Sequence, residues 1–311
     1  MTLNILFAAG PDRWEDYARP LHKALTDAGL DYHLATELPP EEVDYMVYAP
    51  NSTVQDFTPY TRLKAVLNLW AGVEAVTGNP TLTVPLTRMV DAEGLTQGMV
   101  EWVTGHVLRH HLGMDAHIVN PEHRWAPEVP PLATDRKVTI LGLGALGTAC
   151  AEMLSALKFD LAGWARSPKE IPGMTCHSGP EGLAAALEGA EILVLLLPDT
   201  PETRDILDAQ ALARLAPGAA VINPGRGPLI EDAALLAALD TGQVGHATLD
   251  VFREEPLPRD DPYWAHPKVT VTPHIASETR PPSAARVVAE NIRRHQSGAP
   301  LLHQVDRSAG Y

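Results

Sequence analysis

The sequence predicts an α/β protein made of a doubly wound parallel sheet and a second, smaller, flavodoxin-like α/β domain. Its 311 residues exceed the roughly 100 to 200 residues of one typical domain. Between residues 137 and 274, short apolar runs alternate with stretches of helical spacing, as in a parallel sheet that helices cover on both faces. The first hundred residues repeat this alternation more weakly, which indicates a separate unit.

Nine apolar runs are expected to form the strands of the two sheets. In the first hundred residues they are LNILFAA, DYMVYA and LKAVLNLW. In the central block they are KVTILGLG, LAGWAR, ILVLLLP, AAVIN, ATLDVF and VTVTPH. Long helices are expected over residues 93–112 and 282–296 from their apolar spacing. The last helix follows a completed strand pattern, so we expect it to return to the first domain, giving domains of 1–98 plus 282–311 and of 99–281.

Composition limits the possible partners. The formal net charge of -15 argues against nucleic acid or an anionic membrane as the main partner, because those surfaces are bound by clustered Lys and Arg. The two cysteines, Cys150 and Cys176, show no CxxC spacing or disulfide framework. The opening MTLNILFAAG resembles a first strand more than a signal peptide, and the longest apolar runs are too short to cross a bilayer. These features predict a cytoplasmic protein with no membrane partner.

A glycine motif follows the first strand of the central block. In KVTILGLGALG, Gly142, Gly144 and Gly147 have the spacing GxGxxG between a strand and a helix. The first glycine allows a tight turn, the second lets backbone approach a pyrophosphate, and the third permits close packing of helix and strand. The motif predicts a dinucleotide site in a Rossmann domain, with further contacts from Ala145 and Leu146.

The end of the next strand bears on the choice of cofactor. An Asp or Glu about 20 residues after the glycines would hold the ribose diol of NAD, but Ala165 stands there. The polar residues that follow, Arg166, Ser167 and Lys169, can hold a 2'-phosphate. We therefore expect NADPH, with NADH possible if these are only solvated loop charges. Pro198, at the end of ILVLLLP, is a further expected cofactor contact.

Three polar residues follow successive strands of the central block: Arg226, Glu255 and His274. Carboxyl ends of parallel strands share one edge of a sheet, the edge where the glycine loop opens, so these residues should converge. Reduction of a 2-keto acid needs a cation for the carboxylate and carbonyl oxygen and a proton donor for the developing alkoxide. Arg226 can be the cation and His274 the acid, with its pKa raised by Glu255 or the adjacent Glu254. Asp250 is expected to bond loop backbone or a cofactor edge.

The motifs VTILGLGALG, INPGRGPLIEDAALLAAL, LDVFREEPLP and VTPHIA resemble the D-isomer-specific 2-hydroxyacid dehydrogenase family over nearly the whole chain. In that family the arginine of the GRG turn, the glutamate before Pro-Leu and the histidine of Pro-His form the catalytic triad. The resemblance thus implies Arg226, Glu255 and His274, and it selects Glu255 over Glu254.

Within the family, the short first domain and VPLTRMVDAEGLTQGMVEWV resemble the bacterial glyoxylate and hydroxypyruvate reductases of the A type. That resemblance implies NADPH, a 2-keto acid substrate and a homodimer. It further implies that backbone amides of Trp70, Ala71, Gly72 and Val73 bind the substrate carboxylate and that Arg88 lines the pocket. Relatives usually have a small residue where Trp70 stands, so the indole could narrow the pocket or change the acceptor.

Other polar patterns have simpler interpretations. The HxxxHH of His106, His110 and His111 has spacing that could hold zinc but lacks the glutamate of HExxH, so no metal is expected. Trp102 and Trp125 are expected at an interdomain or subunit contact. Two alternatives to the reductase stay open: a nucleotide-sensing regulatory protein, which would not need a general acid, and a dehydrogenase for a larger 2-keto acid.

Overall fold

The computed structural model describes residues 2–307, so residue 1 and residues 308–311, at the ends of the expected first domain, lie outside the description. The chain divides into two compact units: Met1–Leu95 with Glu278–Tyr311, and Thr96–Ser277. We call them the first and the second unit. Among the described residues, no helix combines the length and apolar character that a bilayer crossing requires.

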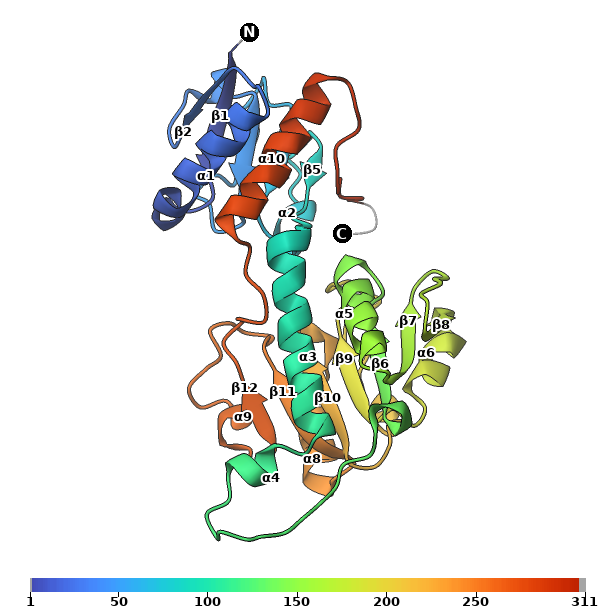
Figure 1. Ribbon diagram of the computed structural model, residues 1–311. Helices are drawn as coiled ribbons and strands as arrows, with labels where there is room; N and C mark the ends of the chain where they lie inside the picture. The colour runs from blue at the N-terminus through green and yellow to red at the C-terminus, as the bar shows by residue number, and fades with distance from the viewer. Residues whose placement is uncertain (1, 308–311) are drawn as a thin grey trace. The chain divides into compact units, whose positions relative to one another are not determined.

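The first unit contains a parallel five-stranded sheet in the order β2-β1-β3-β4-β5 (Figure 1). This is the strand order of flavodoxin-like folds, so the expected fold of the smaller domain is confirmed. The strands are β1 (Leu3–Ala8), β2 (Tyr32–Ala35), β3 (Tyr45–Tyr48), β4 (Ala65–Asn68) and β5 (Leu86–Thr87). The helices are α1 (Trp14–Asp27), α2 (Glu74–Thr77) and α10 (Pro281–Gln296).

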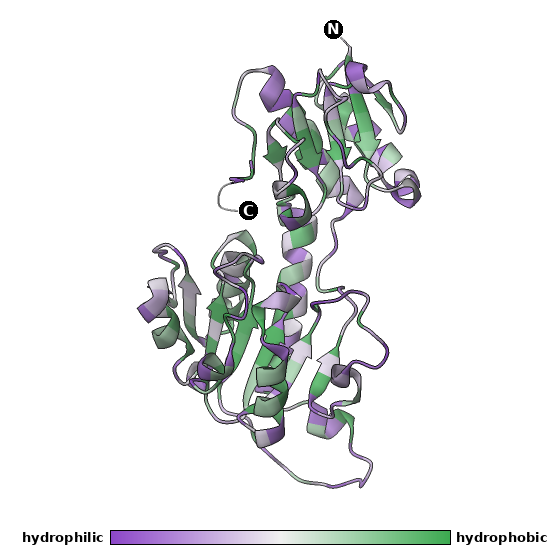
Figure 2. Cartoon of the chain, turned by 180° about the vertical axis from the view of Figure 1, so that it is seen from behind, coloured by the Kyte–Doolittle hydropathy of each residue, from purple (hydrophilic) through white to green (hydrophobic). Residues whose placement is uncertain are grey.

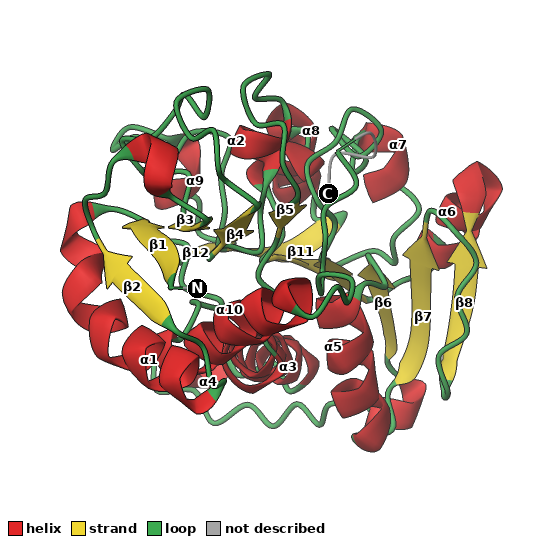
Figure 3. Cartoon of the chain, turned by 90° about the horizontal axis from the view of Figure 1, so that it is seen from above, coloured by secondary structure: helices red, strands yellow, loops and turns green. Residues whose placement is uncertain are grey.

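Both faces of the first sheet are buried. Alternate residues of β1 point to opposite faces: Ile5 and Phe7 join a core with α1 and α10, and Leu6 joins the core on the other face. Helices α1 and α10 lie side by side on their face (Figures 1 and 3). The long last helix therefore packs in the first unit. It starts with two prolines, which suit a first helical turn.

The second unit contains a parallel seven-stranded sheet in the order β12-β11-β10-β9-β6-β7-β8. The chain starts at β6, builds outward through β7 and β8, then returns to β9 and continues to the other edge, which is a doubly wound topology with its switch point between β6 and β9. The expected fold class is confirmed. The strands are β6 (Lys137–Leu141), β7 (Asp160–Ala165), β8 (Met174–Ser178), β9 (Ile192–Leu195), β10 (Ala219–Asn223), β11 (Val244–Leu249) and β12 (Val269–Val271).

Helices cover both faces of this second sheet. The longest are α3 (Gln97–His111), which follows a π-helical turn at Ala92–Thr96, and α5 (Ala145–Ala156), α6 (Gly179–Leu187) and α8 (Asp232–Thr241). The short ones are α4 (Asp115–Ile118), α7 (Ala209–Leu212) and α9 (Pro262–Ala265). One core packs the sheet against α3 and α5, the other against α6, α7 and α8. The central strands are strongly hydrophobic (Figure 2), as expected for strands buried on both faces.

Candidate active site

The glycine loop joins β6 to α5 at the switch point of the second sheet. Gly142 has φ 105°, and a Cβ there would lie 2.5 Å from the Leu196 carbonyl oxygen. At Gly147 a Cβ would lie 1.9 Å from the carbonyl oxygen of Gly142, so any side chain would push the helix off the strand. Gly144 is exposed, with open space where its Cβ would be. The three glycines thus fit the turn, packing and pyrophosphate-approach roles of a dinucleotide loop.

Two strand ends near this loop carry the other expected cofactor residues. Strand β7 ends at the buried Ala165, so this position offers no carboxylate to a ribose diol. The polar residues that follow it are exposed: Arg166, Ser167 and Lys169. After β9, Pro198 is partly buried, and its carbonyl oxygen accepts a hydrogen bond from the Thr203 hydroxyl at 2.7 Å.

The turn after β10 holds Arg226 between two crowded glycines. A Cβ on Gly225 would lie 2.8 Å from the Leu195 carbonyl oxygen, and one on Gly227 would lie 2.0 Å from the Phe252 carbonyl carbon. The backbone after β10 is therefore packed directly against the last residue of β9 and against the backbone that follows β11. Only glycine tolerates such approach, which explains the GRG pattern physically.

A buried asparagine organises this turn. The side-chain oxygen of Asn223 accepts a hydrogen bond from the Gly225 amide at 3.1 Å, and its nitrogen donates to the Arg226 carbonyl oxygen at 2.9 Å. The guanidinium of Arg226 donates to the Gly225 carbonyl oxygen at 2.7 Å. Asn223 belongs to the NPGRG stretch of the sequence, but an asparagine at a strand end has no distinctive spacing that would predict this role.

The structure brings Glu255 and His274 together. The Oε2 atom of Glu255 lies 2.7 Å from Nδ1 of His274, and its Oε1 atom accepts a hydrogen bond from the Phe252 amide at 2.9 Å. Because Nδ1 faces the carboxylate, the pair leaves Nε2 as the ring nitrogen for a ligand. The His274 side chain is 52% exposed and that of Glu255 is 34% exposed, so solvent and small molecules can reach the pair.

This contact shifts both pKa values toward an ion pair. The hydrogen bond and charge of Glu255 raise the pKa of His274 against the lowering effects of burial and of Arg226. Burial alone would raise the pKa of Glu255, but hydrogen bonds from His274 and the Phe252 amide, with the charges of His274 and Arg226, keep it below its usual value. Between these two pKa values His274 is a cation and Glu255 an anion. Arg226 influences both groups electrostatically.

Asp250 anchors the loop that carries His274. Its side chain is 1% exposed and accepts three hydrogen bonds, from the Thr272 hydroxyl at 2.6 Å and from the amides of Ile275 and Ala276 at 2.9 Å each. Its carbonyl oxygen accepts from the His274 amide, also at 2.9 Å. His274 has φ 53°, in the left-handed region that residues other than glycine rarely adopt. Such a conformation persists only where surrounding contacts fix it, and the hydrogen bonds to Asp250 are contacts of this kind. Of the two roles expected for Asp250, the bonding of loop backbone is the one these contacts describe.

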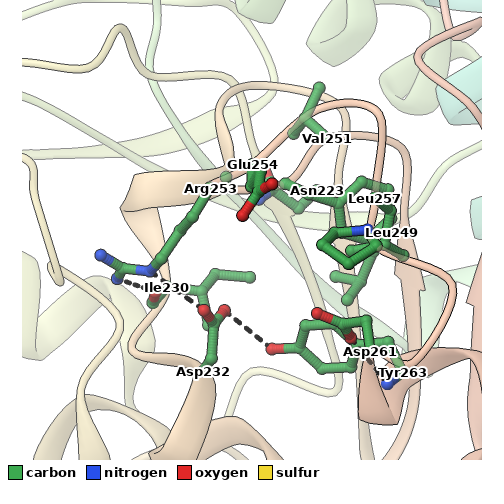
Figure 4. Close-up of a pocket in the computed structure, with 13 residues that line it drawn as sticks. Asn223, Ile230, Asp232, Leu249, Val251, Arg253, Glu254, Leu257, Asp261 and Tyr263 are labelled. Carbon is green, nitrogen blue, oxygen red and sulfur yellow. Dashed lines mark hydrogen bonds and ion pairs between the residues drawn. The ribbon is translucent and has the colours of Figure 1, made fainter.

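A cavity of about 190 Å³ lies beside the loop of Glu255, but neither Glu255 nor His274 lines it. Figure 4 shows its polar wall, in which the Tyr263 hydroxyl donates to Asp232 at 2.9 Å and the guanidinium of Arg253 pairs with the same carboxylate at 3.1 Å. Arg253 also bonds to the Ile230 carbonyl oxygen and pairs with Asp205. This network connects the segment after Arg226 to the segment before Glu255, so we interpret the cavity as part of their support.

The residues expected on the substrate side lie in the first unit. Trp70 to Val73 form the loop after β4, and the Trp70 side chain is 45% exposed. Arg88 directly follows β5, is partly buried, and its amide donates to the His303 carbonyl oxygen at 3.1 Å. Its charge adds to the effect of burial in lowering the pKa of His303.

The helical histidines have structural partners. His110 lies 2.9 Å from the Thr248 hydroxyl, and burial lowers its pKa to about 3. His111 lies 3.5 Å from the Arg136 guanidinium, and the ring of His106 packs against Trp102. Within residues 2–307, no group of three or more His, Cys, Asp or Glu side chains is arranged to hold a metal.

Comparison with known proteins agrees with this geometry. A family model described as D-isomer specific 2-hydroxyacid dehydrogenase, NAD binding domain, matches residues 105–276. Glyoxylate/hydroxypyruvate reductase A of Serratia proteamaculans is 42% identical over 258 residues, which are 80% of this chain and 82% of that protein. The protein of the same name from Yersinia enterocolitica is 40% identical over 257 residues, with the same shares covered.

Two solved structures share the fold over the full chain. A D-isomer specific 2-hydroxyacid dehydrogenase from Xanthobacter autotrophicus Py2, in complex with NADPH and MES, is 41% identical with a TM-score of 0.93, and all of both chains is covered. An NADPH-dependent glyoxylate/hydroxypyruvate reductase from Sinorhizobium meliloti, in complex with NADP and sulfate, is 35% identical with a TM-score of 0.86, covering 100% of this chain and 99% of that one.

Proposed function

The chain belongs to the D-isomer specific 2-hydroxyacid dehydrogenase family, and from this premise we propose that it is an NADPH-dependent reductase of small 2-keto acids such as glyoxylate and hydroxypyruvate. The product is the D-2-hydroxy acid. The observation that carries the proposal is the contact of 2.7 Å between Glu255 and His274, beside the GRG turn of a dinucleotide-binding sheet. A protein that only senses nucleotides does not need a supported general acid.

The second unit fits the cofactor. Its open Gly144, followed by Ala145 and Leu146 at the start of α5, would receive the pyrophosphate, and Pro198 and Asp250 would lie along the remaining cofactor edge. The exposed Arg166, Ser167 and Lys169 would hold the 2'-phosphate of NADPH with charge-assisted hydrogen bonds. When bound, the reduced nicotinamide supplies the hydride that reaches the carbonyl carbon of the substrate.

The triad residues then have separate roles. The guanidinium of Arg226 binds the carboxylate and carbonyl oxygen of the keto acid and stabilises the negative charge that develops on that oxygen. His274, kept protonated by Glu255, delivers a proton from Nε2 to the alkoxide. Glu255 stabilises the imidazolium and fixes the ring orientation through Nδ1.

The first unit supplies the substrate loop in this proposal. Amides of Trp70, Ala71, Gly72 and Val73 bind the substrate carboxylate, and Arg88 lines the pocket. None of these four amides donates a hydrogen bond to a residue within 2–307. The exposed indole of Trp70 stands in this loop, where it either narrows the pocket or changes the acceptor, and a series of keto acids of different size distinguishes the two. We propose 1–98 plus 282–311 as the substrate-binding domain and 99–281 as the dinucleotide-binding domain.

The proposal includes a cytoplasmic homodimer. The end of α4 and the segment that follows it expose five large apolar side chains in the second unit: Ile118, Val119, Trp125, Val129 and Leu132, with Trp125 97% exposed. Apolar side chains gathered in one segment are typical of an interface. Cys150 and Cys176 are both free thiols, and free thiols are typical of proteins that work in a reducing compartment.

A steady-state screen tests the function. Purified protein is mixed with NADPH or NADH and a series of 2-keto acids from glyoxylate and hydroxypyruvate to longer and branched ones, and loss of nicotinamide absorbance is followed. We expect turnover with the two smallest acids and a preference for NADPH. Turnover only with long keto acids would reassign the substrate, and no turnover with any acid would end the proposal.

A further inference from the structure

The last residue of β4, Asn68, lies directly beneath the loop proposed to receive the substrate carboxylate. Its side chain is 1% exposed. Its amide nitrogen donates two hydrogen bonds into the loop, to the Trp70 carbonyl oxygen at 2.8 Å and to the Gly72 carbonyl oxygen at 3.1 Å. No motif or spacing in the sequence marks this residue.

The chemistry of its partners fixes the orientation of the Asn68 amide. Both partners are carbonyl oxygens, which only accept, so the NH₂ group must face them and a flipped amide would place oxygen against oxygen. In this orientation the buried Oδ1 atom has no hydrogen-bond partner within residues 2–307. An unsatisfied buried acceptor lowers the free energy of unfolding, so orienting Asn68 toward the loop has a cost in stability.

Two further donors of the first unit also bond carbonyls in and next to this loop. The Leu69 carbonyl oxygen accepts from the buried Thr279 hydroxyl at 2.7 Å, and the Trp70 carbonyl oxygen also accepts from the Met89 amide at 3.0 Å. The carbonyls of Leu69, Trp70 and Gly72 are therefore all bonded to the first unit. No amide from Trp70 to Val73 is bonded in this way.

Peptide geometry explains why bonded carbonyls and unbonded amides occur together in this loop. In a planar trans peptide, the carbonyl of one residue and the N–H of the next point in opposite directions. Holding the Trp70 carbonyl toward Asn68 therefore turns the Ala71 N–H away from it, and holding the Gly72 carbonyl does the same for the Val73 N–H. In the same way, the hydrogen bond from the Thr279 hydroxyl to the Leu69 carbonyl oxygen turns the Trp70 N–H away from Thr279. Backbone N–H groups of one turn that are left without a partner in this way can bind an anion.

We propose that Asn68 is a positioning residue for substrate binding, which holds two loop carbonyls inward so that the amides of Ala71 and Val73 are presented to the carboxylate of the 2-keto acid. Thr279 assists at the Trp70 amide. This inference rests on the proposed function. Asn68 itself touches neither substrate nor cofactor in this arrangement.

The test replaces Asn68 with leucine, which has similar volume but no donor. We expect KM for glyoxylate to rise about tenfold or more, since misdirected amides lose hydrogen bonds to the charged carboxylate. The kcat value should change less, and the affinity for NADPH, measured by fluorescence titration, should stay unchanged because the cofactor loop lies in the other unit. Asn68→Ser, whose hydroxyl is too short for both carbonyls, gives a second variant if leucine prevents folding.

The matched control is Asn291→Leu. Asn291 is also 1% exposed, lies in the same unit, and bonds backbone by accepting from the Leu302 amide at 2.7 Å. The Asn291→Leu variant should lower Tm without raising KM for glyoxylate. A second pair of variants, at Thr279, tests whether the hydroxyl bond or the packing of the side chain matters. Thr279→Val, which loses the hydroxyl, should raise KM for glyoxylate. Thr279→Ser, which keeps the hydroxyl, should have a KM close to that of the wild-type protein.

The outcomes distinguish failure of the positioning role of Asn68 from failure of the proposed reductase function. If the wild-type protein is active and folded Asn68→Leu or Asn68→Ser keeps the wild-type KM, the positioning role is wrong while the function stands. If both Asn68 and Asn291 variants raise KM equally, the effect is general destabilisation and the inference fails. If wild-type protein reduces no short keto acid, the proposed function fails and this inference fails with it.

Discussion

The two units differ in whether their functional polar groups already have hydrogen-bond partners. In the second unit the chemical side chains are already paired: His274 with Glu255, the His274 turn with Asp250, and the Arg226 turn with Asn223. In the first unit the loop of Trp70 to Val73 has bonded carbonyls, while its amides have no described partner.

This difference follows from what each group must do. A general acid needs a defined pKa and orientation before the substrate arrives, and neighbouring charges supply both. Binding groups for a carboxylate must instead be available when it arrives, so only their direction is fixed in advance. Mutations of the paired catalytic groups in the second unit should therefore act mainly on kcat, and mutations around the loop of the first unit mainly on KM for the keto acid.

Replacing His274 with glutamine should give the largest effect. Glutamine keeps a polar side chain but cannot transfer a proton, so we expect kcat with glyoxylate to fall by about 10² to 10⁴-fold. NADPH binding by fluorescence should remain, since the glycine loop is intact. Near-normal turnover would remove His274 from the mechanism and leave the reductase without its proposed general acid.

Arg226→Lys should be the next most damaging change. An ammonium keeps the charge but not the planar pair of donors, and it also loses the bond to the Gly225 carbonyl oxygen. We expect kcat/KM to fall by roughly 10² to 10³-fold, the range for loss of an oxyanion-stabilising donor. Single-turnover kinetics separates binding from chemistry, and full efficiency of the lysine enzyme would contradict bidentate binding.

Asp250→Asn tests whether the His274 turn depends on its buried carboxylate. The amide can no longer accept on both sides, so one of the donors at Thr272, Ile275 or Ala276 loses its acceptor. Leaving one buried donor unsatisfied should cost about 1–3 kcal/mol in the free energy of unfolding, measured with urea. We also expect a fall of about tenfold in kcat, because an ångström-scale displacement of a catalytic group can cost up to 10²-fold. A less stable enzyme with wild-type kcat would limit Asp250 to a role in folding.

Arg166→Ala should have the smallest effect and should leave kcat unchanged. If Arg166 holds the 2'-phosphate, KM for NADPH should rise about tenfold while KM for NADH stays constant. Parallel titrations with both cofactors measure this ratio. An equal rise for both cofactors would show that the arginine acts on a shared part of the dinucleotide.

The sequence predicted the interior of the fold better than its edges. Central strands such as β9 and β10 are fully buried and read as continuous apolar runs. The three strands that sequence analysis missed, β2, β5 and β8, all lie at sheet edges. Strand β8 has partly exposed residues on both faces, and β5 has only two residues, so neither shows the hydrophobic periodicity on which the prediction depends.

The same limit applies to the candidate site. The glycine loop and the GRG turn could be found because close backbone approach demands glycine at fixed spacing, and the structure contains those approaches. Asn68 and Thr279 could not be found in this way, since their partners are carbonyls brought close only by the fold. No residue type marks such a contact in a single sequence.

The pH dependence of reduction tests the central claim, that Glu255 keeps His274 protonated as the general acid. Because Glu255 raises the pKa of His274, kcat should fall as the pH rises through that raised pKa, at a higher pH than for an ordinary histidine. In Glu255→Gln the carboxylate charge is lost, so this fall should move to lower pH, toward the ordinary histidine value of about 6.5. Superimposable alkaline limbs for the wild-type and Glu255→Gln enzymes would contradict the account.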